Sequence, residues 1–110
     1  MPKKTNSNYN SEIQSIAMKI IAHSGDGRSL AFNALEMARG HDFGKAEKLL
    51  KESDEAIAQA HEVQTQLLTK EANGKKTEFS ILLVHAQNHF MTSMLANELI
   101  KEMVHIYKKI

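Results

Sequence analysis

Two histidines four residues apart, His85 and His89, are the side chains best suited to chemistry in this chain. Because positions i and i+4 share one face of a helix, both imidazoles could bind a divalent metal from that face. In a second interpretation, one imidazole is a nucleophile that accepts a phosphoryl group, and the other donates a hydrogen bond to the phosphoryl oxygens. No Glu follows the first His, so the signature of helical zinc metalloproteases is absent. From the spacing alone, we favour two partly buried structural histidines.

Composition removes several other kinds of site. The chain has no cysteine, which excludes a disulfide scaffold, thiolate catalysis and thiolate zinc ligands. The segment Gly25–Gly27 is not a phosphate loop of the Walker or Rossmann kind, because no predicted strand precedes it. The four remaining histidines are scattered, and we interpret each as structural or solvated: His23, His41, His61 and His105.

Charge and hydropathy argue against a protein that binds nucleic acid or a membrane surface. The 14 Lys and Arg residues balance 13 Asp and Glu residues, giving a net charge of +1 without a basic patch in the sequence. The longest uninterrupted apolar run, Ile81–Val84, is far short of the roughly 20 residues that span a bilayer. Polar residues follow Lys3 and Lys4, so we expect no signal peptide. We expect a cytoplasmic protein with one domain over residues 11–110, preceded by a disordered tail over residues 1–10.

The apolar pattern predicts three long helices, because the only proline stands at position 2 and leaves the rest of the chain free to be helical. The clearest signal covers residues 43–72, where apolar residues recur every three or four positions. This stripe consists of Phe43, Ala46, Leu50, Ile57, Ala60 and Leu67, with Ser53 and Gln64 as its polar members. Asp42 is the expected N-cap, and Gly40 is expected to end the preceding helix in the left-handed conformation. Asn73–Gly74 should stop the second helix, and Thr77–Glu78 should start the third.

The first helix contains an ambiguous segment, Ser24–Gly27, which resembles a turn and would divide residues 11–39 into two short helices. Against a turn, the apolar stripe keeps its phase across the glycines: Ile13, Ile16, Ile20, Gly27, Ala31, Ala34 and Ala38. We therefore predict one helix whose small residues let a neighbour approach closely. Three helices of about 30 residues, each about 45 Å long, then form an all-α, antiparallel up-down-up bundle.

The third helix carries more apolar residues than one protomer can cover. The first stripe comprises Leu82, Ala86, Ala96 and Leu99, with His85 and His89 among them; the second stripe comprises Ile81, Val84, Met91 and Leu95; and Leu83, Phe90 and Met94 spread further round. A helix that is apolar on most of its circumference must be covered on most of it, so we infer self-association through the second stripe. Asn88 lies in the middle of that stripe, where one buried Asn can fix the register and number of associating helices. The alternative is that Asn88 and Met91 face solvent.

Residues 80–94, SILLVHAQNHFMTSM, closely resemble the signature around the phosphorylated histidine of the lactose/cellobiose-type enzyme IIA proteins. These proteins belong to the phosphoenolpyruvate-dependent sugar phosphotransferase system (PTS). The resemblance covers nearly the whole chain, including the small-residue segment 24–29, the first turn at 40–43 and the second-helix motif at 60–65. Residues 95–100, LANELI, look more like the chitobiose/cellobiose branch than the lactose branch.

The resemblance implies a phosphotransferase that is a homotrimer of three-helix protomers. It implies that His85 accepts a phosphoryl group from the phosphocarrier HPr and passes it to a cysteine of the cognate IIB protein. The sugar, a cellobiose-, chitobiose- or lactose-type disaccharide, would enter through the membrane protein IIC. His89, one turn on, can donate a hydrogen bond to the same phosphoryl group, and Thr92 at i+7 lies on the same line. Gln87 points to the opposite side of its helix, so it serves a neighbouring protomer's site or packing.

At the position of Asn88 the family has an aspartate on the trimer axis, where three copies hold a divalent metal. Three neutral amides are a much weaker site for a hard cation than three carboxylates, so we expect no metal and no required cofactor here. Three amides can instead form a ring of hydrogen bonds without repulsion between like charges. Two other classes of protein stay open: a non-catalytic helical interaction or regulatory module, and a metal-binding helical oligomer that uses His85 and His89.

Overall fold

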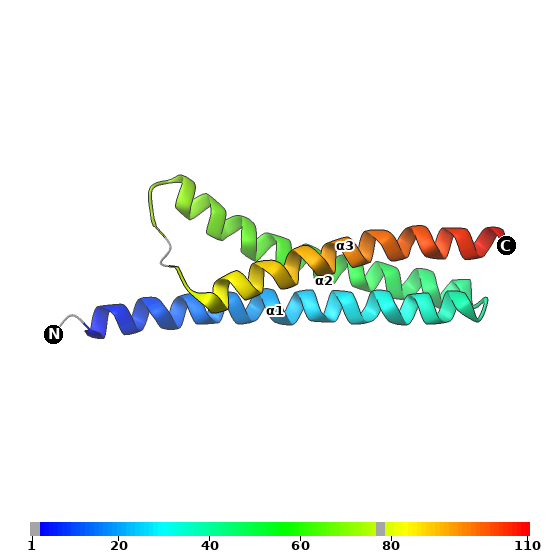
Figure 1. Ribbon diagram of the computed structural model, residues 1–110, viewed down its shortest axis with the longest axis horizontal. Helices are drawn as coiled ribbons and strands as arrows, with labels where there is room; N and C mark the ends of the chain where they lie inside the picture. Colours follow the sequence, from blue (N-terminus) through cyan, green and yellow to red (C-terminus); the bar gives the residue numbers. More distant parts are fainter. Residues whose placement is uncertain (1–2, 77–78) are drawn as a thin grey trace.

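The computed structural model describes residues 3–76 and 79–110, and within these ranges the chain forms three α-helices and no strand. The helices are α1 (Lys3–Arg39), α2 (Phe43–Ala72) and α3 (Ile81–Lys109), and they run up, down and up (Figure 1). α1 packs along both α2 and α3, which contact each other less extensively. The molecule measures 64 × 22 × 18 Å along its principal axes. The prediction of an all-α, antiparallel three-helix bundle is confirmed.

α1 runs unbroken through Ser24–Gly27, as the continuous phase of its apolar stripe predicts. At Gly27 an added Cβ atom would lie 2.6 Å from Cδ1 of Ile57 on α2. Real side chains do not come this close, so the glycine is what lets the two helices approach here. The small residue therefore serves packing between helices and not a turn.

The N-terminal segment differs from the expectation of a tail. α1 begins at Lys3, so residues 3–10 have helical backbone. Each residue added to an existing helix gains a hydrogen bond without a new nucleus, so a polar segment without an apolar pattern can continue a helix that packing has already formed. Met1 and Pro2 lie outside the described residues.

α2 has the predicted bounds and buries the predicted stripe. Its buried residues are Ala46, Leu50, Ser53, Ile57, Ala60 and Leu67, while the expected members Phe43 and Gln64 are half-buried. Asp42 is the N-cap, and its carboxylate accepts a hydrogen bond from the backbone N–H of Lys45 at 3.2 Å. At the other end Asn73 is the C-cap, and Gly74 follows with a φ of +89°, which is typical of glycine.

Two details of the connections correct the sequence analysis. The left-handed residue after α1 is His41, with a φ of +62°, and not Gly40. The N–H of Gly40 still bonds to the carbonyls of Glu36 and Met37, so the chain reverses one residue later than predicted. α3 is capped by Ser80, whose hydroxyl accepts from the backbone N–H of Leu83 at 3.0 Å. The expected start, Thr77–Glu78, lies outside the described residues.

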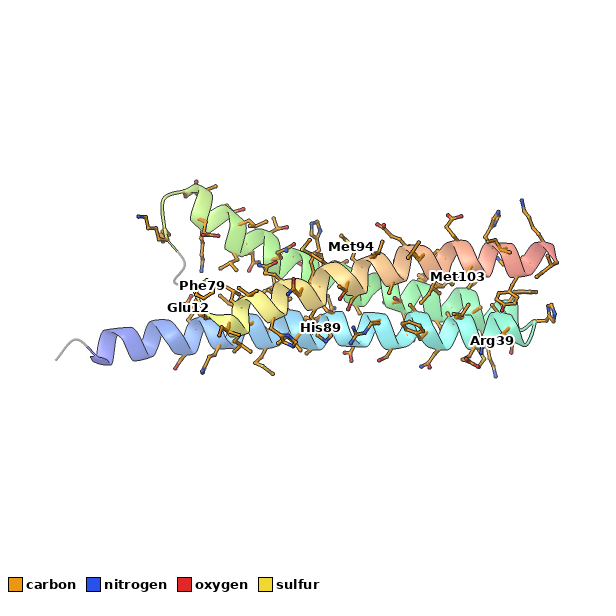
Figure 2. The ribbon with its side chains drawn as sticks, viewed as in Figure 1. Glu12, Arg39, Phe79, His89, Met94 and Met103 are labelled. Carbon is orange, nitrogen blue, oxygen red and sulfur yellow. The ribbon has the colours of Figure 1, made fainter. Side chains whose placement is uncertain are left out.

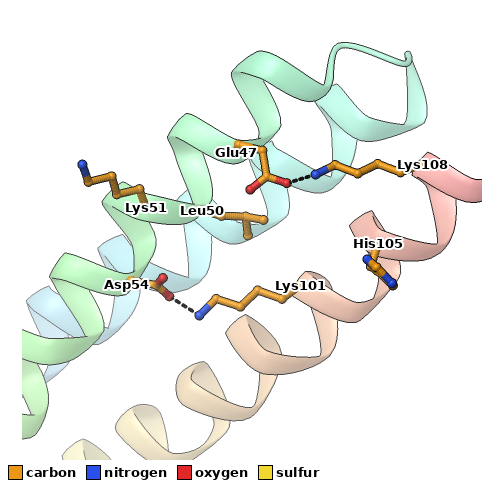
Figure 3. Close-up of a pocket in the computed structure, with 7 residues that line it drawn as sticks. All are labelled: Glu47, Leu50, Lys51, Asp54, Lys101, His105 and Lys108. Atoms are coloured by element: carbon orange, nitrogen blue, oxygen red, sulfur yellow. Dashed lines mark hydrogen bonds and ion pairs between the residues drawn. The ribbon is translucent and has the colours of Figure 1, made fainter.

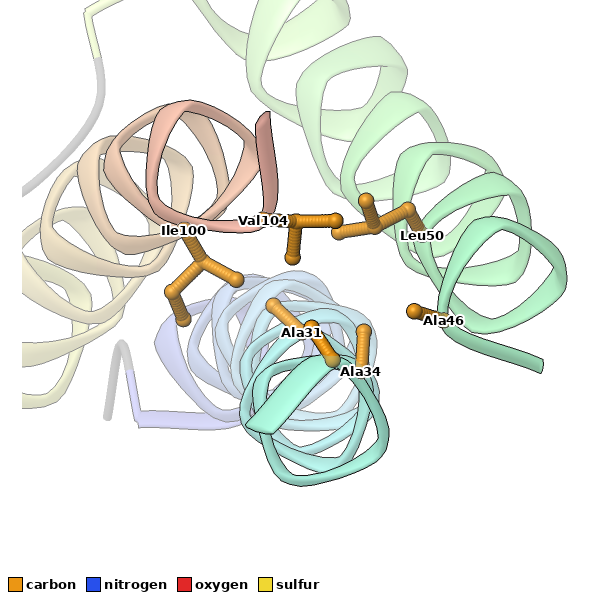
Figure 4. Packing of buried hydrophobic residues seen from close by; sticks show 7 residues of the cluster. Ala31, Ala34, Ala46, Leu50, Ile100 and Val104 are labelled. Carbon is orange, nitrogen blue, oxygen red and sulfur yellow. The ribbon is translucent and has the colours of Figure 1, made fainter. Parts of the chain in front are cut away.

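The core of the described residues contains two apolar clusters. The alanine cluster, near the C-terminal end of α1, consists of Ala31, Ala34, Ala38, Ala46, Leu50, Ile100 and Val104. Figure 4 shows how the longer side chains of this cluster gather over its alanines. The phenylalanine cluster, toward the N-terminal half of α1, consists of Ala17, Ile20, Ile57, Ala60, Ala86 and Phe90. In the alanine cluster, the small side chains on α1 let α2 and α3 lie close to it.

Between these clusters, the buried side chains of Ser53 and Asn97 and the exposed ion pair of Asp54 with Lys101 form a chain of polar contacts that joins α1, α2 and α3. The Ser53 hydroxyl donates to the carbonyl of Gly27 at 2.6 Å, and Nδ2 of Asn97 donates to the Ser53 hydroxyl at 2.8 Å. The same Nδ2 also donates to the carboxylate of Asp54 at 3.1 Å, and Asp54 forms an ion pair with Lys101 at 2.6 Å. We call this set, from Gly27 to Lys101, the polar chain. Because these donors meet acceptors, their burial carries little desolvation penalty.

The buried face of α3 only partly follows the first predicted stripe. Its buried residues are Ala86, Phe90, Ser93, Asn97, Ile100 and Val104. Phe90 was placed outside the stripe, and Leu99, placed inside it, is 50% exposed. A helix with apolar residues on most sides does not reveal from sequence which side faces the bundle, and the polar contacts of Asn97 help to decide it here.

The second stripe lies uncovered on the protomer, as predicted. Ile81, Val84, Met91 and Leu95 are 80%, 44%, 57% and 54% exposed, and Asn88 among them is exposed too. A row of large apolar side chains of this length is unusual on the surface of a monomer. None of the described helices combines the length and the apolar content that a membrane span requires.

Candidate functional site

His85 and His89 lie in the first half of α3. Figure 2 shows His89 where α3 passes over α1. Their rings meet edge to face, with centroids 5.7 Å apart and an interplanar angle of 77°. The two environments differ: His85 is exposed, whereas His89 is half-buried. The structure therefore places the two predicted histidines side by side. Their rings differ in how far they are exposed to solvent.

α1 supplies the surface on which His89 rests. A Cβ atom added at Gly25 would lie 3.7 Å from Cε1 of His89, so the imidazole sits against a position that has no side chain. One turn further along α1, Nη2 of Arg28 lies 3.3 Å from Nε2 of His89. A guanidinium has donors and no acceptor, so this hydrogen bond requires a lone pair on Nε2. His89 is then neutral and carries its proton on Nδ1.

The electrostatics of the site favour the same neutral form. Burial lowers the pKa of His89 below its usual 6.5, and the nearby Arg28 and His85 lower it further. A hydrogen bond with the backbone of His89 itself raises the pKa and is the smallest contribution. Nδ1 of His89 is buried and has no hydrogen-bond partner among the described residues. The site thus contains a buried N–H without an acceptor, next to an exposed imidazole.

Arg28 is a site residue that the sequence analysis did not single out. It falls within the small-residue segment 24–29 that carries part of the resemblance, but nothing in its spacing points to a histidine 61 residues away. The sequence shows only that Arg28 stands three residues after Gly25, so that both residues lie on one face of α1. Only the register between α1 and α3 shows that this face meets His89.

The supporting residues predicted from the sequence occupy different surroundings. The Thr92 hydroxyl is exposed and donates to the backbone carbonyl of Asn88 at 2.8 Å, so its proton is engaged within its own helix. Gln87 accepts a hydrogen bond from Gln64 on α2, which holds it on the side of α3 away from His85. Within the protomer Gln87 therefore serves packing between α2 and α3.

Within one protomer, His85 and His89 do not form a metal site. Among the described residues, no group of three or more His, Cys, Asp or Glu side chains is placed to hold an ion. His89 would have to offer Nε2, which already accepts from the cationic Arg28. Asn88, at the position where the family carries its axial aspartate, offers a neutral amide on the open surface.

A cleft between α2 and α3 lies well apart from the two histidines. It has a volume of about 300 Å³ and is lined by Glu47, Leu50, Lys51, Asp54, Lys101, His105 and Lys108 (Figure 3). Two ion pairs cross it, one between Asp54 and Lys101 at 2.6 Å and one between Glu47 and Lys108. The carboxylates compensate these lysines, so the cleft acts as a salt-bridged contact between helices.

Comparison with known proteins gives consistent matches over most of the chain. Residues 15–108 match the family described as "PTS system, Lactose/Cellobiose specific IIA subunit". The PTS system lactose-specific EIIA component of Staphylococcus epidermidis is 43% identical over 98 residues, covering 89% of this chain and 94% of the relative. The crystal structure of the PTS cellobiose-specific enzyme IIA from Bacillus anthracis superposes with a TM-score of 0.86 at 40% identity, covering 88% of this chain and 89% of that one. The IIA(chitobiose)–HPr complex of the Escherichia coli phosphotransferase system contains a chain that superposes with a TM-score of 0.77 at 43% identity. The match covers 88% of this chain and 94% of that one.

Proposed function

Because the chain belongs to the lactose/cellobiose-specific IIA family of the PTS, we propose that it carries a phosphoryl group on the imidazole of His85. The observation that supports this assignment is the contrast between two neighbouring rings. On the single protomer His85 is exposed on α3, whereas His89 is half-buried and engaged by Arg28. A nucleophile that reacts with two protein partners in turn must be accessible, and His85 is the accessible member of the pair.

The relay has two balanced steps. In the first, a lone pair of neutral His85 attacks the phosphorus carried by HPr, so that an N–P bond forms on His85 as the bond to HPr breaks. In the second, the thiolate of a IIB cysteine attacks the same phosphorus; an S–P bond forms, and His85 recovers its lone pair. Such transfers depend on positioning and on compensating the charge of the phosphoryl oxygens. The complex of HPr with a related IIA supports HPr as the donor.

The charge of the phosphoryl group must be met largely by side chains. α3 begins at Ile81, so His85 lies one turn into the helix, where its own backbone N–H is bonded within the helix. His89 carries its free proton on Nδ1, a buried N–H that lacks a partner among the described residues. We expect this N–H to gain an acceptor when a phosphoryl oxygen arrives beside it. Thr92 can contribute only by turning its hydroxyl away from the Asn88 carbonyl.

The uncovered second stripe supports assembly into a homotrimer. Three copies of α3 that meet through Ile81, Val84, Met91 and Leu95 would remove these side chains from water. The Asn88 amides would then meet in the seam and bond to one another without an ion. Analytical ultracentrifugation should give three times the mass of the 110-residue chain, with or without a chelator. A monomer at micromolar concentration would contradict the assembly. In this proposal the protein works in the cytoplasm with HPr, IIB and, indirectly, IIC.

The direct test is phosphate uptake. The protein is incubated with phosphoenolpyruvate, enzyme I and HPr, and its intact mass is then measured. We expect the wild type to gain one acid-labile phosphoryl group and His85→Gln to gain none while keeping its helicity. His105→Gln is the matched control, because it removes another exposed histidine from α3. Uptake by His85→Gln would move the nucleophile elsewhere. No uptake by the wild type would favour a non-catalytic module, or a metal-binding oligomer if zinc then binds through both histidines.

A further inference from the structure

The two transfer steps described above do not explain one contact in the site. It is the hydrogen bond from Arg28 on α1 to Nε2 of His89 on α3, at 3.3 Å. Arg28 is half-buried, so its guanidinium has fewer alternative positions than a side chain in open solvent. Its place along α1 is also fixed, because the neighbouring residue Gly27 accepts the hydrogen bond of Ser53 and lies against Ile57. The bundle thus holds Arg28 at a defined height beside α3.

The bond decides the chemical form of His89. A neutral imidazole has one N–H and one lone pair, and which nitrogen carries the proton depends on its surroundings. Arg28 cannot accept a hydrogen bond, so Nε2 must present a lone pair and Nδ1 must carry the proton. The charged or titratable groups that act on this ring are Arg28 from α1 and His85 on α3 itself. From α2, His61 stacks on Phe90, with centroids 5.8 Å apart, and so faces a different ring.

We propose that Arg28 is a positioning residue for phosphoryl transfer: its guanidinium fixes His89 as the neutral Nδ1–H tautomer and holds that ring edge to face with His85. The kinetic part of this inference rests on the proposed function, and the structural part does not. Fixing the tautomer determines which nitrogen of His89 donates when the phosphoryl group arrives. A guanidinium suits this task because it stays charged and donates at every pH at which the protein is folded.

The first test examines the ring without any partner protein. The protein is labelled with ¹⁵N, and the imidazole nitrogens of His89 are followed by NMR from pH 5 to pH 8, with His89→Gln identifying the signals. In the wild type we expect Nδ1 to be protonated and Nε2 to be bare. In Arg28→Ala the two tautomers should mix, and the pKa of His89 should rise toward its usual 6.5, because one neighbouring positive charge is gone while burial remains. Arg28→Lys keeps a charged donor and should retain the lowered pKa in part.

The second test measures the rate of phosphate uptake from phosphorylated HPr by single-turnover kinetics. We expect Arg28→Ala to be slower by about tenfold, the effect of losing one charge-assisted hydrogen bond, and Arg28→Lys to recover part of the rate. The rate of phosphate uptake by Arg28→Ala should fall further at acidic pH, because His89 then takes up a proton in this variant. Arg39→Ala is the control: Arg39 is an exposed arginine on α1 whose ion pair with Glu36, at 2.7 Å, is remote from the histidines. It should match the wild type in both tests.

Each outcome supports or overturns the inference. A wild-type His89 protonated on Nε2, or an Arg28→Ala spectrum identical to that of the wild type, overturns the structural part. A changed tautomer with an unchanged rate overturns the positioning role and leaves Arg28 as a structural contact. If the wild type takes up no phosphate at all, the proposed function fails, while the NMR measurement still decides whether Arg28 sets the tautomer. Circular dichroism on each variant ensures that the compared proteins are folded.

Discussion

Two regions of the bundle place polar groups between helices, and they do so in opposite ways. In the polar chain, the Ser53 hydroxyl and the Asn97 amide donate to acceptors on neighbouring helices, and the carboxylate at its end is neutralised by Lys101. In the histidine site, Nε2 of His89 is engaged while Nδ1 is buried without a partner among the described residues. A satisfied polar group stabilises one arrangement of the helices, whereas an unsatisfied one beside an exposed nucleophile is ready to bind something that arrives later. The first region therefore holds the fold, and the second region is where we propose that phosphoryl transfer takes place.

The largest effect on stability should follow from opening the polar chain. Asn97→Ala removes hydrogen bonds to Ser53 and Asp54 and leaves a small cavity in the middle of the bundle. We expect the free energy of unfolding to fall by about 3 kcal/mol in chemical denaturation. Asn33→Ala, which changes an exposed asparagine on α1, is the control and should differ from the wild type by less than about 0.5 kcal/mol. Equal effects of the two substitutions would mean that the polar chain does not hold the fold.

Substitutions in the histidine site should change the rate of phosphate uptake more than they change the stability of the protein. His89→Ala removes the donor beside His85 and should slow phosphate uptake from HPr by about 30-fold without abolishing it. Single-turnover kinetics measure this rate, and His105→Ala on the same helix should leave it unchanged. A completely inactive His89→Ala protein that remains folded would mean that the roles of the two histidines are exchanged.

The smallest effect is a dependence of stability on pH. The folded protein lowers the pKa of His89, so on acidification the unfolded chain binds a proton at His89 near pH 6.5 before the folded protein does. The His89 contribution should therefore be constant above about pH 7 and should destabilise the fold as the pH falls through 6.5. Urea denaturation at pH 7.5 and pH 5.5 measures the slope. His89→Ala should show a shallower slope than the wild type, and an equal slope would contradict the lowered pKa.

The sequence predicted those elements whose signals are local. α2 has its predicted bounds because a long apolar period, the Asp42 cap and the Asn73–Gly74 stop all agree. The continuity of α1 followed from the phase of one stripe, which outweighed the local turn signal of its glycines. In the site, the i and i+4 spacing placed His85 and His89 together, and the structure brings their rings to 5.7 Å.

What the sequence did not show depends on contacts between helices. α3 is apolar on most sides, so its periodicity did not identify Phe90 as buried or Leu99 as exposed. The bond between Arg28 and His89 joins residues 61 apart and depends on the relative height of α1 and α3, which no pattern within either helix encodes. The same holds for the hydrogen bond between Ser53 and Asn97, which joins α2 to α3 and which the pattern of neither helix predicts.

The position of the polar chain midway along the bundle has a consequence for local opening. The two apolar clusters lie on either side of it, so fraying that begins at one end of the molecule meets this set of hydrogen bonds before it reaches the other. Amide hydrogen exchange should therefore be slowest near Gly27, Ser53 and Asn97, and it should divide the protein into two halves that open separately. Arg28 follows Gly27 directly, so it lies on the part of α1 where we expect local opening to be rarest.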